Sequence, residues 1–541
     1  MANAFYTIPT PSNEPVLDYS PGSEERETLL AEVQRRRSIE MDIPMIIGGQ
    51  EVRTGTTHRL APPYDHAHTV GHYHQGNATH VQQAIDAALA AKESWAAMPW
   101  NDRAAIFLRA ADLISGPRRD FMNAATMLAQ SKNIYQSEID AVAELADFFR
   151  FNAAYMEEIY AEQPESSKTI WNQMEFRPLE GFVFAITPFN FTAIAGNLPG
   201  APAMMGNTVV WKPADSQIYS AYAVMQILME AGLPDGVINL IYTDGPVAGD
   251  IIFAHRDFAA LHFTGSTGVF NQLWKTIGEN IETYKTYPRI VGETGGKDFV
   301  MVHPSAVVDQ VVVGLLRGAF EFQGQKCSAA SRAYIPESIW PEVQEKLLAM
   351  TKELQVGTPE DFGNFINAVI DERAFDKIVG YIEQAKSDAD VDVLIGGTYD
   401  KSKGYFIAPT ILRAHQADYT TMCEEIFGPV LTIYVYPDDQ YTETLHTLDE
   451  TSRYALTGSI FAKSRAAIDE ARYVLRNAAG NFYINDKPTG AVVGQQPFGG
   501  ARRSGTNDKA GSILNLYRWV SPRTIKENFI PPTDYRYPFL G

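Results

Sequence analysis

The sequence predicts an α/β protein that holds at least two domains built on parallel sheets. Three observations support this prediction. The chain has 541 residues and a mass of 60.0 kDa, which is too long for a single hydrophobic core. Short apolar runs alternate with helical segments over most of the chain, as strand–helix–strand units do. The hydrophobic content of 45% and the charged content of 20% are typical of a soluble globular protein.

The expected elements follow one another in a clear order. A Pro/Ser-rich arm and a charged helix fill the first forty residues, residues 44–75 resemble strands and hairpins, and residues 77–161 have helical periodicity. Strand-like runs then alternate with helices, and a second α/β series runs from about residue 299 to about residue 483. The strand-like runs of the first series are GFVFAIT, NTVVWK, VINLIY, AALHFTG and YPRIVGE. The aromatic-rich end, SPRTIKENFIPPTDYRYPFLG, reads as an arm that packs on another subunit.

Charge and composition restrict the partners. The net charge of −20 argues against nucleic acid and anionic membranes, which both need a basic protein surface. No apolar stretch is long enough to span a membrane, and the start of the chain lacks the features of a secretory signal. With only 2 cysteines, a reducing compartment is expected. We therefore expect a cytoplasmic protein, or a mitochondrial matrix protein if the chain is a processed eukaryotic form, with a small-molecule substrate.

One biased patch contains six of the 11 histidines. Two pairs in it have i, i+2 spacing, which would place each pair on one face of a strand. Neither cysteines nor an acidic pattern accompany them, so we expect an exposed polar hairpin and assign no metal. The six are His58, His66, His68, His72, His74 and His80.

The most informative residue is Cys327, in GQKCSAASR, because a polar turn and a run of small residues surround it. Such a place can expose a thiolate to a small substrate, although a lone cysteine can also be a small buried hydrophobe. Glu293, in VGETGGKDFV, follows a predicted strand and can act as a general base, or can be a solvated turn residue. Asn190, in TPFNF, can donate to an oxyanion or can cap the helix that follows.

Other loops after predicted strands suit a dinucleotide. Lys212 and Asp215, in WKPAD, can contact a ribose, and a carboxylate there would repel a 2′-phosphate and favour NAD over NADP. Gly265 and Ser266, in FTGSTGVF, lie between a strand and a helix, where backbone N–H groups can bind phosphate. This run is not the six-residue glycine fingerprint of dinucleotide sites.

Seven motifs occur in order along nearly the whole chain: FNF with Asn190, WKPAD, FTGST, GETGGK, GQKCSA, EEIFGP and PFGG. Together they closely resemble the aldehyde dehydrogenase superfamily. The longer runs AELADFFRFNA and NDKPTGAVVGQQPFGGARRSGTNDKAG resemble the branch that oxidises L-glutamate γ-semialdehyde to L-glutamate in proline catabolism.

The resemblance implies a Rossmann-like NAD domain, an α/β catalytic domain and a small β oligomerisation flap, in a homodimer or higher homo-oligomer. Residues 1–164 would form the N-terminal arm and the first part of the NAD-binding domain, and residues 181–297 its Rossmann-like part. Residues 298–510 would form the catalytic domain. The flap would comprise residues 165–180 and an arm of residues 511–541.

The resemblance also implies a role for each site residue. Cys327 would be the nucleophile, Asn190 with the Cys327 N–H the oxyanion hole, and Glu293 the base for hydrolysis of a thioester. Lys212 and Glu425 would hold the two riboses of NAD, Ser266 the pyrophosphate, and Phe427 would flank the nicotinamide. For the substrate, Glu144 would lie near the amino group. Ser328 with the backbone of Gly490 and Ala491 would bind the carboxylate, and Phe191 and Phe498 would line the aliphatic stem.

Three alternatives remain open on the sequence alone. One is a dehydrogenase of another ω-semialdehyde, such as succinate semialdehyde. A second, of a different class, is a cofactor-free thiol hydrolase, whose ester turnover would not depend on Lys212 or Glu425. The third is a non-enzymatic scaffold, which the presence of both Cys327 and Glu293 disfavours.

Overall fold

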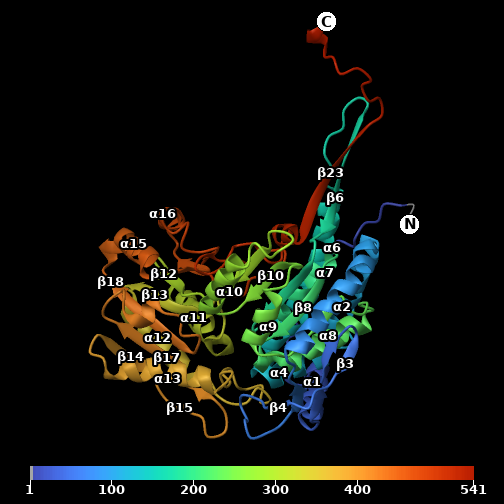
Figure 1. The fold of residues 1–541 in the computed structure, drawn as a ribbon. Helices are drawn as coiled ribbons and strands as arrows, with labels where there is room; N and C mark the ends of the chain where they lie inside the picture. Colours follow the sequence, from blue (N-terminus) through green and yellow to red (C-terminus); the bar gives the residue numbers. More distant parts are fainter. Residues whose placement is uncertain (1–3) are drawn as a thin grey trace.

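A computed structural model describes residues 4–541, and residues 1–3 of the expected N-terminal segment lie outside the described part. Two seven-stranded sheets, each accompanied by helices, form the body of the protein, and a two-stranded ribbon stands out from it (Figure 1). The C-terminal residues extend beyond the end of this ribbon. The predicted α/β class is confirmed.

The first sheet contains the five strands expected between residues 181 and 297, which are all parallel to one another. Its inner strands are short and almost wholly buried, as expected for strands that are covered on both faces, whereas the edge strand β11 is only partly buried. Two strands from residues 44–75 extend the sheet in antiparallel fashion, so the sheet is mixed at this edge. The strand order is β11 (Arg289–Glu293), β10 (Phe258–Thr264), β7 (Phe182–Thr187), β8 (Thr208–Pro213), β9 (Ile238–Leu240), β2 (Met45–Ile47) and β3 (Gln50–Val52).

Helices from two parts of the chain accompany this sheet. Those between the strands are α7 (Thr192–Met204), η2 (Asp215–Gln217), α8 (Ile218–Glu230), α9 (Gly245–Ile252) and α10 (Thr267–Glu279). Those of the N-terminal part are α1 (Glu24–Arg37), α2 (Ala78–Ala97), α3 (Trp100–Ser115), α4 (Arg119–Gln130), α5 (Ile134–Ser137) and α6 (Leu145–Ala161). A small sheet pairs β1 (Met41–Ile43), β5 (Gly71–His74) and β4 (Thr57–Leu60).

Between α5 and α6 the chain forms a π-helical turn, η1 (Glu138–Glu144). Its wider turn brings two carboxylates into the interior, those of Glu138 and Asp140, which are both fully buried. Asp140 accepts hydrogen bonds from the backbone N–H groups of Thr192 (2.9 Å) and Ala193 (2.8 Å) at the start of α7. The π-turn therefore fixes the beginning of a helix in the first sheet's core.

The second sheet has helices on both faces, and its central strand β12 shows this directly. Phe299 and Met301 pack into one apolar cluster, whereas Val300 and Val302 pack into another on the opposite face. β14 is antiparallel to its neighbour at the edge of an otherwise parallel sheet. The strand order is β14 (Val391–Ile395), β17 (Thr410–Ala414), β18 (Val430–Tyr436), β13 (Ala330–Pro336), β12 (Asp298–Val302), β20 (Thr457–Phe461) and β21 (Asn481–Ile484).

The other elements of this part are short or lie around the sheet. Its helices are α11 (Val308–Phe320), η3 (Glu321–Gly324), α12 (Trp340–Glu353), α13 (Glu372–Ser387), α14 (Thr420–Cys423), η4 (Asp438–Gln440), α15 (Tyr441–Thr451) and α16 (Arg465–Val474). Two short antiparallel pairs join β15 (Tyr399–Asp400) to β16 (Phe406–Ile407), and β19 (Tyr454–Ala455) to β22 (Ala501–Arg502). The expected domain boundary at 297/298 coincides with the start of β12.

The ribbon pairs β6 (Ile170–Pro178) with β23 (Val520–Asn528) in antiparallel register, although the two strands lie more than 300 residues apart in the chain. β6 lies inside the expected flap range 165–180, and β23 inside 511–541. The last elements are α17 (Ile513–Leu516), η5 (Tyr517–Trp519) and η6 (Pro538–Leu540). Exposed apolar side chains gather on the ribbon and tail, including those of Trp171, Phe529 and Ile530.

Candidate active site

A cavity of about 280 Å³ lies where loops of the two large sheets meet. Strands β10 and β11 of the first sheet contribute Phe263 and Glu293, and the loop before β13 of the second sheet contributes Cys327. The cavity brings together the predicted nucleophile, the predicted base and every predicted substrate contact. These are Glu144, Phe191, Glu293, Cys327, Ser328, Gly490, Ala491 and Phe498.

Cys327 follows a sharply bent segment. Phe322 and Gln323 have left-handed backbone angles (φ 51° and 54°), and Gly324 has φ 67°. A side chain at position 324 would collide with the carbonyl group of Gly428, so this turn requires glycine. The bend delivers the thiol to the cavity wall, where it lines the cavity rather than filling a closed core.

The surroundings of Cys327 favour the neutral thiol. Burial raises the pKa of the Cys327 thiol well above its usual range, and the carboxylates of Asp298, Glu293 and Glu425 raise it further. These surroundings favour the neutral thiol over the thiolate, so nucleophilic attack requires that the sulfur first lose its proton.

Glu293 is the last residue of β11 and points into the cavity instead of lying on a solvated turn. Its carboxylate accepts a hydrogen bond from the backbone N–H of Gly500 (3.1 Å). Burial raises the pKa of Glu293 well above its usual range, and this hydrogen bond opposes the shift only in part. A buried carboxyl with a raised pKa is suited to proton transfer near neutral pH.

Asn190 lies in the turn between β7 and α7 and is buried. The helix-cap interpretation is wrong, because the capping position is Phe191 and Asp140 accepts the first N–H groups of α7. The Nδ2 group of Asn190 donates to the carbonyl oxygen of Gln325 at 3.1 Å, two residues before the thiol. An amide nitrogen carries two N–H groups, so one remains for an oxyanion.

A Gly–Gly turn after Glu293 connects the thiol to the cofactor side. The N–H of Gly296 donates to Oε1 of Glu425 at 2.9 Å. A side chain at Gly295 would collide with the Glu425 carboxylate, and one at Gly296 with the carbonyl oxygen of Cys327. The two glycines thus let Glu425 and the thiol loop approach the same backbone.

The remaining predicted cofactor contacts lie at the ends of parallel strands, where ligands bind in open α/β sheets. Lys212 is the penultimate residue of β8, its side chain is only 12% exposed, and its Nζ lies 3.6 Å from the Oδ1 of Asp215. Gly265 and Ser266 connect β10 to α10, and the Ser266 side chain caps that helix by accepting from the Val269 N–H (3.3 Å).

These residues fit a dinucleotide. The ammonium group of Lys212 is mostly buried and only loosely paired with Asp215, so it can donate to ribose hydroxyls. The N-terminus of the thirteen-residue helix α10 can bind pyrophosphate. Phe427 has φ 63° and packs edge-on against Phe189, with ring centres 5.8 Å apart. Phe427 lies on the loop after Glu425, and from this position its ring can flank a flat heterocyclic ring.

Sequence reasoning missed several polar residues around the cavity. Lys132, which is fully buried, pairs with Asp140 (2.6 Å) and lies 4.2 Å from the ring centre of Phe191. Ser328 shares a hydrogen bond with Thr489 at 2.8 Å. Thr489 directly precedes Gly490, which the sequence already suggested as a substrate contact, so Thr489 could have been found from its neighbour. No local sequence pattern links Lys132 to the cavity.

The histidine patch lies on β4, β5 and the loop between them, except for His80 in the first turn of α2, and none of its members lines the cavity. His74 contacts Asp42 (2.7 Å) and the backbone of Thr54. His58 stacks on Tyr73, with ring centres 5.4 Å apart. Within residues 4–541, no group of three or more metal-binding side chains is found. None of the described helices is both long and apolar enough to cross a membrane.

Comparison with known proteins extends these observations. Residues 52–525 match the model of the aldehyde dehydrogenase family. The mitochondrial delta-1-pyrroline-5-carboxylate dehydrogenase of Dictyostelium discoideum is 52% identical over 536 residues, which cover 98% of this chain and 96% of that protein. The delta-1-pyrroline-5-carboxylate dehydrogenase of Agaricus bisporus is 53% identical over 541 residues, with 99% and 98% covered.

Solved structures agree with the sequence comparison. The Mycobacterium tuberculosis delta-pyrroline-5-carboxylate dehydrogenase bound with NAD has a TM-score of 0.97 and 52% identity, and each chain is fully covered. A Thermus 1-pyrroline-5-carboxylate dehydrogenase with bound NAD has a TM-score of 0.90 at 30% identity. The predicted aldehyde-dehydrogenase-like architecture is confirmed, and the chain belongs to the aldehyde dehydrogenase family.

Proposed function

We propose that this protein is an NAD-dependent dehydrogenase that oxidises L-glutamate γ-semialdehyde, in equilibrium with Δ1-pyrroline-5-carboxylate, to L-glutamate in proline catabolism. One observation carries the proposal: a single cavity holds the thiol of Cys327, the carboxyl of Glu293, and the Ser328, Gly490 and Glu144 groups suited to an amino-acid head. Relatives with this activity in their names are about half identical over nearly the whole chain, and homologous structures contain NAD.

The chemistry begins at the thiol. The Cys327 sulfur passes its proton to water and adds to the aldehyde carbon, and the carbonyl oxygen becomes an alkoxide. Asn190 and the Cys327 N–H stabilise this charge as an oxyanion hole. Bound NAD supplies the acceptor for the hydride that leaves the same carbon. The product on the enzyme is a thioester of Cys327.

Hydrolysis then requires a base. Glu293 takes a proton from water, the resulting hydroxide adds to the thioester carbon, and the sulfur leaves as the acid is released. A raised carboxyl pKa makes Glu293 a stronger base once it has lost its proton. We therefore assign Glu293 to hydrolysis, since the water-activating step needs this basicity.

Binding roles follow from the same placement. Lys212 and Glu425 would hold the riboses, Gly265 and Ser266 the pyrophosphate, and Phe427 would flank the nicotinamide. Asp215, beside Lys212, would disfavour a 2′-phosphate and thus NADP. The substrate carboxylate would be bound by Ser328 and by the N–H groups of Gly490 and Ala491, and its amino group by Glu144. Phe191 and Phe498 would line the stem.

We also propose that the β6–β23 ribbon joins copies of the chain into a homodimer or higher homo-oligomer. A two-stranded ribbon with exposed Trp171 and Phe529 is marginally stable alone and gains stability when its apolar side chains are covered. We place the protein in the cytoplasm or, as a processed form, in the mitochondrial matrix; the names of several relatives call those proteins mitochondrial.

The test is NADH formation with Δ1-pyrroline-5-carboxylate and, separately, with succinate semialdehyde. We expect a higher kcat/KM for the first substrate and no turnover by Cys327→Ala. A folded, NAD-binding wild type that does not oxidise Δ1-pyrroline-5-carboxylate would refute the substrate assignment. Ester hydrolysis that persists in Lys212→Ala without any NAD-dependent oxidation would instead favour a cofactor-free thiol hydrolase.

A further inference from the structure

The N-terminal arm lies along the helix that leads to the cavity, and it runs in the opposite direction. The N–H of Ile8 donates to Glu157 in α6 at 2.6 Å. Further along, the N–H of Leu17 donates to Glu138 in η1 at 3.1 Å. The arm therefore follows nearly the whole length of α6 and η1, although it contains no regular helix or strand before α1.

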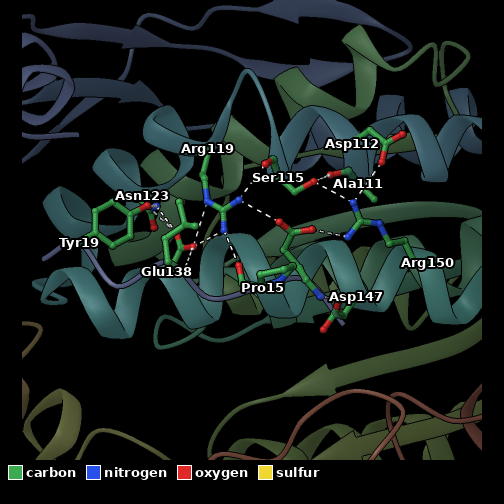
Figure 2. A network of polar contacts seen from close by, with 12 residues as sticks. Pro15, Tyr19, Ala111, Asp112, Ser115, Arg119, Asn123, Glu138, Asp147 and Arg150 are labelled. Carbon is green, nitrogen blue, oxygen red and sulfur yellow. Dashed lines mark hydrogen bonds and ion pairs between the residues drawn. The ribbon is translucent and has the colours of Figure 1, made fainter. Parts of the chain in front are cut away.

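A cluster of ion pairs fastens the middle of this arm (Figure 2). The Glu14 carboxylate lies between two arginines, at 3.0 Å from Arg119 Nη1 and 2.7 Å from Arg150 Nη1. The side chains of Glu14 and Arg119 are each 13% exposed, so solvent screens this pair weakly. Arg119 also binds the fully buried Glu138, and this contact ties the clamp to η1.

Next to the clamp, Asn13 connects two walls of the cavity. Its Nδ2 group donates to Asp147 Oδ2 in α6 (2.8 Å) and to the carbonyl oxygen of Val493 (2.8 Å). Its Oδ1 accepts from Nε2 of Gln495 (2.9 Å). The neighbouring N–H of Glu14 donates to the other oxygen of Asp147 (2.7 Å). Asn13 and Glu14 themselves line the cavity.

The two structures that Asn13 joins are those proposed to recognise the amino-acid head. Asp147 lies one helical turn beyond Glu144, and Val493 lies two residues beyond Ala491. The loop around Gly490 and Ala491 contains no regular helix or strand, and Gly490 has a left-handed backbone (φ 92°). Backbone N–H groups bind a carboxylate well only when the loop that carries them is held in place.

We propose that Asn13 is a positioning residue for substrate specificity: it sets the distance between the Gly490–Ala491 loop and the helix of Glu144. This inference rests on the proposed function, because it concerns recognition of the amino-acid head. The arm is then part of the substrate site, with the Glu14 clamp as its fastening. Other contacts also support the loop, since Val493 is buried in the core. Loss of Asn13 therefore loosens the loop without releasing it.

The test compares Asn13→Ala with Ser12→Ala, a matched change at an exposed neighbour on the same arm. We expect Asn13→Ala to raise the KM for Δ1-pyrroline-5-carboxylate about fivefold to tenfold, the loss expected for one or two hydrogen bonds. The kcat, the KM for NAD and the kcat/KM for propanal, which has no amino-acid head, should stay at wild-type values. Ser12→Ala should match the wild type throughout.

A second variant tests the inference independently, in case Asn13→Ala does not fold. Glu14→Gln keeps the size of the side chain but weakens the clamp, so it should shift the same KM in the same direction by a smaller factor. Asn13→Asp should raise this KM more than Asn13→Ala does. Both variants lose the two N–H donors, but only Asn13→Asp also places a carboxylate beside Asp147.

The outcomes separate the two proposals. A wild type that does not oxidise Δ1-pyrroline-5-carboxylate refutes the proposed function. An active wild type refutes the inference alone if Asn13→Ala and Glu14→Gln both keep its KM for this substrate. An equal loss with propanal and with Δ1-pyrroline-5-carboxylate also refutes it, because it would show that the arm only supports the fold.

Discussion

Replacing Glu144 by glutamine is expected to make the protein more stable but a poorer enzyme. Glu144 ends the π-turn η1 and lines the cavity. Burial raises the pKa of its carboxyl from 4.5 to about 8, and nearby Asp140 adds to the shift while Lys132 opposes it. The fold therefore holds a carboxyl that is costly to ionise until a cationic amino group arrives.

The size of the effect follows from this shift. From 4.5 to about 8 is ~3.5 pKa units, which corresponds to ~5 kcal/mol at pH 8 and above. Because Glu144 is partly open to the cavity, we reduce this to ~2 kcal/mol for screening by water. A carboxyl whose pKa is higher in the folded state destabilises the fold above its unfolded pKa. The penalty is thus small near pH 4.5 and grows until the pH reaches about 8.

The assay is the melting temperature of the wild type, Glu144→Gln and the exposed control Glu443→Gln at pH 5 and pH 8. Glu144→Gln should melt about 2 °C above the wild type at pH 8, because ~2 kcal/mol is divided by an unfolding entropy of ~1.1 kcal/mol/K for a chain of this length. The gain should be much smaller at pH 5, and the control should melt with the wild type. The KM of Glu144→Gln for Δ1-pyrroline-5-carboxylate should rise at least tenfold, because a neutral amide would replace the carboxylate that we propose binds the substrate amino group. A gain in stability that does not depend on pH, or no gain at pH 8, would refute the reasoning.

Three further predictions concern other parts of the site. Glu293→Gln should still give a burst of about one NADH per subunit while steady turnover falls by ~10²-fold or more, as seen by stopped-flow absorbance; a burst that disappears in a folded variant would contradict its role in hydrolysis. Gly296→Ala should cost ~2–3 kcal/mol of stability, since its new methyl group meets the carbonyl of Cys327. The control is Gly380→Ala, at a helical position with open space, which should cost no stability. Equal melting temperatures for the two variants would show that the methyl group at position 296 does not collide with the carbonyl of Cys327. Lys212→Ala should raise the KM for NAD by ~10-fold or more at unchanged KM for the aldehyde, and an unchanged NAD titration would remove Lys212 from the cofactor site.

Most of what the sequence could predict about the site concerns residues at the ends of strands. Glu293 and Lys212 come directly after apolar runs, and the C-terminal ends of parallel strands share one edge of a sheet. Their general placement could thus be predicted without knowing any contact. The same logic failed for Asn190 as a helix cap, because the true acceptor, Asp140, comes from a π-turn about fifty residues earlier. A cap supplied from a distant segment leaves no local pattern.

Loops that are held by other loops were equally hard to predict. The composition of the PFGG run gave no indication of its role, yet its last residue, Gly500, donates to the Glu293 carboxylate in the folded chain. One edge of each large sheet is antiparallel, and this could not be read from the alternation of strands and helices, because an antiparallel edge strand needs no crossover helix. The N-terminal arm was expected from its Pro/Ser-rich composition, but composition did not predict that its Asn13 reaches the loop after Ala491.

The π-turn η1 also bears on how this protein could change its preference during evolution. A π-turn holds more residues than an α-turn, so the loss of one residue within 138–143 would let the segment close as a regular α-helix. Asp140 and Glu144 would then lie three positions apart instead of four if the lost residue came from between them. Asp140 binds the first N–H groups of α7, and Glu144 lines the cavity. Such a deletion would therefore move the acidic wall of the cavity relative to the start of α7 and leave Cys327 unchanged.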